Sequence, residues 1–257
     1  MTYFIVGITA LVASGLTLFS GFGLNTILLP VFAVFFPIET AIVMTAVVHM
    51  ANNAFKLAFV GRKVDMKIAL RFGLPAIITA FAGAWLLTKL SSLPPIAAYN
   101  LGQYTFNITA INVIIGILMI AFSLFELLPR FEKIDIDLKW LPLGGLISGF
   151  FGGLSGHQGA VRSVFLSKAK LDKESFIATG IIISFMVDIT RMSVYAGDIA
   201  RIGINANWGL VGIAMISAFA GAFVGLRFLK KITFNSIRIL VGVMLILMGV
   251  LIALGLI

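Results

Sequence analysis

Two short polar stretches carry residues suited to chemistry in a chain of 257 residues that is 60% hydrophobic. The stretch "GLSGHQGAVR", residues 153–162, combines glycines with a histidine, a glutamine and an arginine, and "FSGFGLN", residues 19–25, is a shorter stretch of the same kind. Glycine lets a ligand approach the backbone closely, and the free N–H groups at a helix N-terminus bind anions. We expect a helix to begin in each stretch, at about Gly23 and Gly159, so that the pair forms a site for a small anion.

The residues of these stretches that we expect to bind a substrate are Ser20, Gly21, Phe22, Gly23, Asn25, Ser155, Gly156, His157, Gln158, Gly159 and Arg162. Arg162 lies one helical turn past the glycine break and is therefore expected deep in the membrane, where an unpaired arginine costs about 2.5 to 3.5 kcal/mol. It is either a cation of the site or the partner of Asp188 in a structural ion pair.

Six further candidates lie inside long apolar runs: His49, Asn52, Asn53, Lys56, Asp188 and Arg191. Lys56 and Arg191 either snorkel to the headgroups or flank the substrate path as gates, Lys56 toward the cytoplasm and Arg191 toward the exterior. Asn53 and Asp188 stand three residues before them on the same helical faces, so Asp188 is also placed to neutralise Arg191. Asn52 offers side-chain donors to an oxyanion.

The chain holds two histidines, His49 and His157. Each is either a buried packing residue or the carrier of a coupled proton, because histidine titrates near neutral pH. Two histidines without clustered carboxylates or cysteines do not predict a metal site. No phosphate-binding "GxxxxGKS" pattern is present, so ATP is not expected to energise the protein, and no cofactor is expected.

The composition identifies an integral membrane protein. Apolar residues make up 60% of the chain and charged residues only 11%, which exceeds what a soluble globular domain needs. The formal net charge is +9, but the basic residues stand in short breaks between apolar runs, where orientation signals and anionic lipid headgroups account for them. No basic stripe with interleaved aromatic residues predicts a nucleic-acid partner. The absence of cysteine excludes disulfides and thiolate metal sites.

A helix needs about 20 apolar residues to cross a bilayer. Six runs meet that length: 39–60, 67–89, 105–127, 174–196, 207–229 and 236–257. The regions 3–36 and 140–168 are also apolar but are interrupted by the two glycine-rich stretches, so each is interpreted as a re-entrant hairpin of two helical arms joined at a break. The N-terminus has no basic residue before its apolar run, so we expect it to belong to the mature fold and not to a cleaved signal peptide.

Loop charge predicts the orientation, because Lys and Arg accumulate on the cytoplasmic side. Basic residues gather in four breaks, at 62–71, in the linker 128–139, at 168–173 and at 230–238. The loop 91–104 has no charge, and the loop 197–206 has only Asp198 and Arg201. We therefore expect the basic breaks inside the cell and both termini outside.

The chain contains an internal duplication. A shift of 135 residues aligns Ser20-Gly21 with Ser155-Gly156, Glu39 with Glu174, Asn53 with Asp188 and Lys56 with Arg191, and a shift of 138 aligns "AFAGA" at 80–84 with the same letters at 218–222. Each copy, 1–127 and 140–257, is one broken-helix hairpin followed by three spans. Because three is odd, the copies run in opposite orientations, which predicts an all-α membrane protein with two inverted repeats whose breaks meet near the midplane. The "AFAGA" segments are expected to allow close helix packing.

At these residues the chain resembles the TauE/SafE sulfite exporter family, also called the sulfonate uptake permease family. The resemblance rests on the duplicated unit, on the turns "SGFG" and "SGFFGGLSG" near the start of each half, and on the "FAGAW" segment. It covers nearly the whole chain. It implies a secondary transporter for sulfite, sulfonates or related organosulfur anions in a prokaryotic plasma (inner) membrane, with a coupled proton and a homodimer left open.

Two other classes of function remain open at this stage. One is an intramembrane enzyme acting on a lipid or a peptide, because "GLSGHQG" contains Ser155 and His157. These residues stand only two positions apart and have no evident acidic partner, so they do not predict a catalytic triad. The other is a structural or receptor protein that transports nothing.

Overall fold

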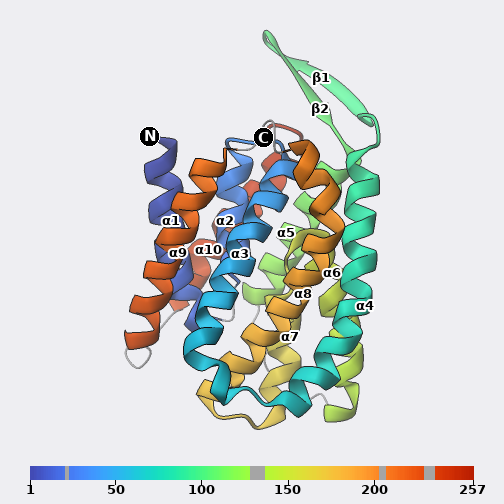
Figure 1. Cartoon of the computed structure of the whole chain (residues 1–257). Helices are drawn as coiled ribbons and strands as arrows, with labels where there is room; N and C mark the ends of the chain where they lie inside the picture. Colours follow the sequence, from blue (N-terminus) through green and yellow to red (C-terminus); the bar gives the residue numbers. More distant parts are fainter. Residues whose placement is uncertain (21–22, 128–136, 203–206, 229–234) are drawn as a thin grey trace.

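A computed structural model describes residues 1–20, 23–127, 137–202, 207–228 and 235–257 (Figure 1). The first half contains α1 (Thr2–Ser20), α2 (Leu24–Ala33), α3 (Ile38–Val60), α4 (Met66–Ser91) and α5 (Ala110–Leu127). The second half contains α6 (Leu141–Ser155), α7 (Gly159–Leu166), α8 (Lys173–Ile202), α9 (Trp208–Phe228) and α10 (Asn235–Ala253). Short 3-10 turns lie at Gly61–Lys63 (η1), Leu138–Trp140 (η3) and Ser167–Ala169 (η4).

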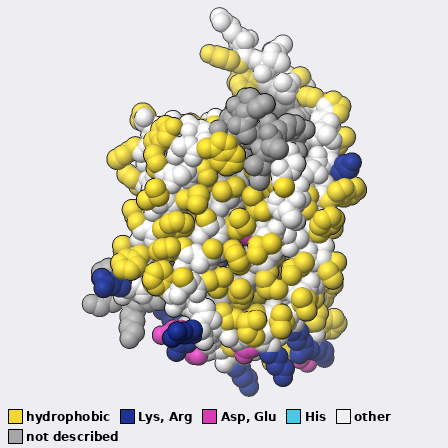
Figure 2. Space-filling model, viewed as in Figure 1, with side chains coloured by type: hydrophobic (Ala, Val, Ile, Leu, Met, Phe, Trp, Pro, Cys, Tyr) yellow, Lys and Arg dark blue, Asp and Glu magenta, His cyan; other side chains and the backbone are white. Residues whose placement is uncertain are grey.

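The described helices are those of a membrane protein. Four of them are long and apolar enough to cross a bilayer, over Ile38–Lys63, Met66–Ser91, Lys173–Gly197 and Trp208–Arg227. Shorter apolar helices cover Thr2–Leu16, Leu24–Ala33, Ala110–Phe125 and Ile239–Ala253. Hydrophobic side chains cover the middle of the surface in Figure 2, as expected for side chains that face lipid. The prediction of a helical membrane protein is confirmed.

One element contradicts the all-helical prediction. The expected loop 91–104 and the start of the expected span 105–127 form an antiparallel hairpin of β1 (Ala97–Leu101) and β2 (Tyr104–Ile108), and α5 begins only at Ala110. The second strand, "YTFNI", alternates aromatic and β-branched residues with polar ones, which favours a strand over a helix. Gly102 has a φ of 63° and supplies the tight turn between the strands. The hydroxyl of Tyr99 donates to the carbonyl of Leu254 over 2.9 Å, which ties the hairpin to the end of α10.

Helix α8 also extends beyond its predicted end, since it continues to Ile202 through part of the expected loop 197–206. Gly197 lies within this extension, and a single helical glycine costs only about 1 kcal/mol relative to alanine, which is too little to end the helix. At its other end, the carboxylate of Asp172 accepts from the backbone N–H of Ser175 over 2.9 Å. This hydrogen bond caps the start of α8 and lowers the pKa of Asp172.

Small residues hold the two halves together. Helix α4 packs along α6, α1 packs along α9, and α5 packs along α10. A Cβ atom added at Gly83 would collide with the α6 backbone at Phe150 and Leu154, and one added at Gly221 would collide with the α1 backbone at Leu11. These glycines belong to the two "AFAGA" segments, so the prediction that the segments serve close helix packing is confirmed.

The two ends of the bundle differ in charge. Both termini and the β1–β2 hairpin lie at one end of the molecule (Figure 1). Lys and Arg side chains gather at the opposite end (Figure 2). Arg62 and Lys63 are exposed between α3 and α4, and Lys67 and Arg71 are exposed at the start of α4.

The contact at Gly83 can be tested with an alanine scan of helical glycines. Gly83→Ala should lower the free energy of unfolding by about 1–3 kcal/mol, because its methyl group has no room against the α6 backbone. The matched control is Gly212→Ala on α9, where nothing lies within 4 Å of an added Cβ. That variant should leave stability unchanged or raise it by up to about 1 kcal/mol. Thermal unfolding of the detergent-solubilised proteins measures both, and equal melting temperatures would contradict the close packing.

Candidate functional site

The site is built on two interrupted helices. Helix α1 ends at Ser20 and α2 begins at Leu24, whereas α6 ends at Ser155 and α7 begins at Gly159. The predicted starts of the second arms, Gly23 and Gly159, therefore lie within one residue of the observed ones. The side chain of Ser20, together with Gly21 and Phe22, lies outside what the structure describes.

Neither second arm has a side-chain cap at its start. The N-cap residues, Gly23 and Gln158, make no capping hydrogen bond through a side chain. The first N–H groups of a helix have no acceptor within the helix, and the helix dipole is positive at this end. Within the described residues, both arms therefore begin with backbone N–H groups that no side chain caps.

The start of α2 touches the second break. The side-chain amide of Asn25, in the first turn of α2, donates to the carbonyl of Ser155 at the end of α6 over 3.0 Å. Gly156 follows with a φ of 79°, a conformation that favours glycine. A Cβ atom at Gly156 would collide with the amide of Asn25 and with the guanidinium of Arg191. Elements α2, α8 and the α6–α7 turn thus meet at one point, so Asn25, the described end of the first stretch, lies beside the second stretch.

A buried carboxylate organises the residues next to this point. Asp188 on α8 is fully buried, and its Oδ2 atom lies 2.8 Å from His49 Nδ1 on α3. The same oxygen accepts a hydrogen bond from Asn53 Nδ2 over 2.8 Å. The Oδ1 atom lies 2.8 Å from a terminal guanidinium nitrogen (NH2) of Arg191. The expected neutralisation of Arg191 by Asp188 is confirmed. The same carboxylate also binds His49 and Asn53, which come from the other half of the chain.

Several buried polar atoms beside the network have no hydrogen-bond partner among the described residues. They are Nε and NH1 of Arg191, Nε2 of His157, both side-chain amide atoms of Gln158 and Oδ1 of Asn25. His157 is held in place from its other side, because its Nδ1 lies 3.2 Å from Ser155 Oγ and its ring stacks on Phe122 at 5.8 Å. An unpaired buried polar group costs about 1–3 kcal/mol, and all of these belong to the second break or to residues that contact it.

Lys56 and Arg191 do not snorkel. Lys56 is 4% exposed and Arg191 is fully buried, so neither charge reaches the headgroups and that interpretation is wrong. The amide of Asn52 lies between Ser14 Oγ, the carbonyl of Ala218 and Lys56 Nζ. In the orientation that satisfies all three, its oxygen accepts from Lys56 over 3.0 Å. Asn52 is therefore a partner of Lys56 and not a free donor.

Arg162 makes a different contact from the predicted ion pair. It lies on α7, half-buried, and its guanidinium donates to the hydroxyl of Ser184 on α8. Both oxygens of Asp188 are occupied by His49, Asn53 and Arg191, and within the described chain no ion pair joins Asp188 to Arg162. The alternative of a structural Arg162–Asp188 pair is therefore wrong.

Three residues of the site were missed in the sequence. Ser184 holds Arg162, the hydroxyl of Tyr195 donates to the carbonyl of Gly153 over 2.5 Å, and Ser148 Oγ donates to the carbonyl of Gln158 over 3.1 Å. Positions 184, 188, 191 and 195 follow the 3.6-residue period of one helix face. Because Ser184 and Tyr195 lie on the same helix face as Asp188 and Arg191, the helical period was the signal in the sequence that could have identified them.

The site has an excess of positive charge. Three basic side chains, Lys56, Arg162 and Arg191, stand against one acidic side chain, Asp188, in this group. Uncompensated charge in a membrane interior is costly, so such a group is normally completed by a partner of opposite sign. Together with the free donors of α2 and α7, the arrangement is suited to an anion.

A protein-family model matches the chain. The family model described as "Sulfite exporter TauE/SafE" matches residues 4–252, which is nearly the whole chain. No curated protein matches the chain.

The buried network predicts a large effect of removing its carboxylate. Asp188→Asn should lower the free energy of unfolding by about 3–5 kcal/mol, because Arg191 would then keep a buried charge without a counter-charge. The control is Asp137→Asn, which breaks the exposed ion pair of Asp137 with Lys139 and should leave the melting temperature unchanged. Thermal unfolding of both variants in detergent tests the difference, and a fully stable Asp188→Asn protein would show that the network is not needed for the fold.

Proposed function

Because the chain belongs to the TauE/SafE sulfite exporter family, we propose that it is a secondary transporter that moves sulfite, a sulfonate or a related organosulfur anion across a prokaryotic plasma membrane. Members of this family are membrane transporters and not enzymes, so the alternative of an intramembrane enzyme is abandoned. Membership of this family also argues against the other alternative, a structural or receptor protein that transports nothing. Ser155 and His157 are then parts of the break and not a catalytic pair.

The observation that carries the proposal is the set of unpaired buried donors around the second break. Arg191 offers Nε and NH1, and Gln158 offers its amide, while the first N–H groups of α7 lie in the same turn. Charge-assisted hydrogen bonds from a guanidinium and bonds from a helix N-terminus are both suited to an oxyanion. A sulfite or sulfonate group would supply the acceptors that these donors lack.

The basic side chains of the site, which outnumber the acidic ones, support a negatively charged substrate. With Asp188 engaged by Arg191 and His49, Lys56 and Arg162 have no carboxylate partner among the described residues. An anion that binds between α2 and α7 would lower the electrostatic cost of burying them. Lys56 and Arg191 occupy equivalent positions in the two halves, and we assign them to the two sides of the path, Lys56 toward the cytoplasm and Arg191 toward the exterior.

The two halves are proposed to be inverted repeats. Under an exchange of α1–α5 with α6–α10, the contact of α1 with α9 corresponds to that of α6 with α4, and α2 with α3 corresponds to α7 with α8. The contacts α3 with α8 and α5 with α10 map onto themselves. Together with the opposite loop charges, these pairs support a pseudo-two-fold axis in the membrane plane, with the basic end in the cytoplasm and both termini outside.

A coupled proton fits the same site. His49 contacts the carboxylate of Asp188 through Nδ1, and its Nε2 faces the first break, since it lies 3.7 Å from a Cβ atom built at Gly23. Histidine gains or loses a proton near neutral pH, and a neighbouring anion changes its affinity for that proton. We place the coupled proton on His49.

Transport by reconstituted protein tests the proposed substrate. Proteoliposomes are loaded with sulfite, sulfate, thiosulfate, taurine or sulfoacetate, each with and without a pH gradient, and flux is measured. We expect unmodified flux of at least one sulfur anion, and about a tenfold or larger rise of apparent KM in Gly156→Ala, whose methyl group would displace Asn25 and Arg191. Gly212→Ala, where an added Cβ meets nothing, is the control for insertion and should transport normally. Normal transport by a folded Gly156→Ala protein would remove the break from the binding site.

Arg162 is expected to act by its charge. Arg162→Lys should keep part of the transport, whereas Arg162→Gln should raise the apparent KM about tenfold or more, because it removes the positive charge. Ser184→Ala is the matched control, since it removes the hydrogen-bond partner of Arg162 but leaves its charge. If Ser184→Ala and Arg162→Gln impaired transport equally, Arg162 would serve structure and not the anion.

A further inference from the structure

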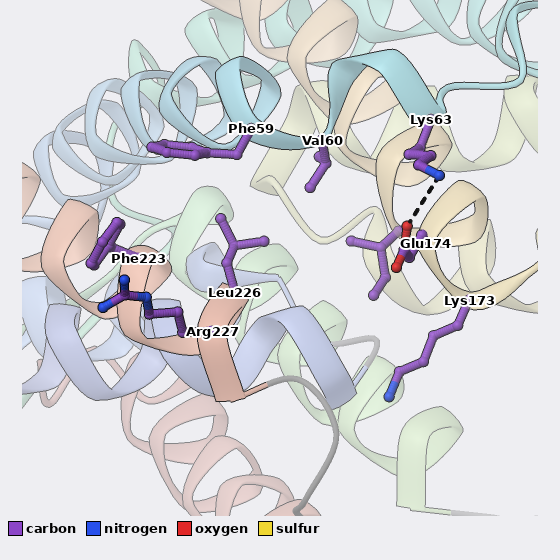
Figure 3. A pocket seen from close by; sticks show the side chains of 9 residues that line it. Phe59, Val60, Lys63, Lys173, Glu174, Phe223, Leu226 and Arg227 are labelled. Carbon is purple, nitrogen blue, oxygen red and sulfur yellow. Dashed lines mark ion pairs between the residues drawn. The ribbon is translucent and has the colours of Figure 1, made fainter.

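A pocket lies at the basic end of the molecule, away from the helix breaks. It has a volume of about 520 Å³ and opens between the end of α3, the start of α8 and the end of α9 (Figure 3). Its lining residues are Phe59, Val60, Lys63, Lys173, Glu174, Ile177, Phe223, Leu226 and Arg227. A volume of this size accommodates a ligand considerably larger than a sulfur oxyanion.

The apolar wall of the pocket is continuous with the lipid-facing surface. Phe59 is 53% exposed and Phe223 is 44% exposed, and their rings lie edge to face at 6.2 Å. Large apolar side chains that are exposed on a membrane-spanning helix face lipid tails. The pocket is therefore accessible from the bilayer as well as from the aqueous side.

The polar wall of the pocket is mostly basic over the residues that the structure describes. Among the described lining residues, three are basic, Lys63, Lys173 and Arg227, and one is acidic, Glu174. Glu174 and Lys63 point toward one another in Figure 3, at 3.5 Å, and both side chains are more than half exposed. The guanidinium of Arg227 lies 5.4 Å from the ring of Phe223, so charge and apolar wall are adjacent.

We propose that this pocket binds an anionic phospholipid, with its phosphate headgroup on Lys63, Lys173 and Arg227 and an acyl chain along Phe59 and Phe223. Basic pockets between membrane helices on the cytoplasmic side are suited to anionic headgroups. A free phosphate would contact the cations but would leave the apolar wall unused, whereas a phospholipid complements both. The inference concerns a separate site and does not depend on the identity of the transported anion.

Lipid retention by the purified protein tests the proposal. The protein is reconstituted in nanodiscs of phosphatidylcholine with increasing fractions of phosphatidylglycerol, and lipids that survive transfer to detergent are counted by native mass spectrometry. The pocket variant is Lys63→Gln, Lys173→Gln, Arg227→Gln. The matched control is Arg62→Gln, Lys67→Gln, Arg71→Gln, which removes the same charge from exposed positions at the same end but outside the pocket lining.

We expect the unaltered protein and the control variant to retain phosphatidylglycerol in preference to phosphatidylcholine. The pocket variant should bind it about tenfold to a hundredfold more weakly, because each cation near a membrane surface contributes a severalfold gain in affinity. Glu174→Gln should bind it more tightly, since a carboxylate is removed from the headgroup site. Phe59→Ala should weaken the binding of phosphatidylglycerol but not that of inorganic phosphate.

Three results would overturn the proposal. Equal losses in the pocket and control variants would indicate a general attraction of the basic surface. Inorganic phosphate that displaces phosphatidylglycerol at micromolar concentration would indicate a site for a free anion. No preference for phosphatidylglycerol over phosphatidylcholine would exclude an anionic-lipid site. None of these results bears on transport, which is measured separately.

Discussion

The buried carboxylate of Asp188 is the constraint on which the site depends. A charge of this kind in a membrane interior persists only when it is paired, and Asp188 is paired on both oxygens, with His49 and Asn53 at one and Arg191 at the other. Helix α3 and helix α8 come from different halves of the chain. The carboxylate therefore fixes the contact between the halves and at the same time holds the guanidinium of Arg191 against the second break.

The backbone of the second break leaves room for the side chains of Arg191 and Asn25. Arg191 and Asn25 approach Gly156 so closely that a side chain there has no room, and the positive φ of Gly156 is one that glycine adopts at little cost. Irregular backbone is tolerated at membrane depth where protein covers it. Helix α4 covers α6 along a line of glycines, and α9 covers α1 in the corresponding way. Close packing by small residues thus covers the breaks in which the buried, unpaired donors lie.

Much of the site could be predicted from the sequence, because polar residues in an apolar chain are few and their spacing is informative. The two breaks, the polar faces that include Asn53 and Asp188, and the packing of "AFAGA" follow from local rules. The partners of individual side chains could not be predicted in this way. Arg162 pairs with Ser184 and not with Asp188, and Asn52 pairs with Lys56. Both pairings depend on how the helices are placed relative to one another in space. The β1–β2 hairpin was missed because hydrophobicity alone assigned its residues to a loop and a span, although their alternation favours strands.

The differences between the two halves follow from the same electrostatics. At equivalent positions the first half carries Asn53 and Lys56, and the second carries Asp188 and Arg191. Asn53 donates to Asp188 directly, so these equivalent positions touch, and two carboxylates at this distance would repel each other. A neutral amide in one half and an acid in the other make the contact favourable. The same difference between the halves leaves one carboxylate, that of Asp188, beside the two equivalent basic residues Lys56 and Arg191. The asymmetry that makes the contact between the halves favourable therefore also leaves more basic than acidic side chains in the site.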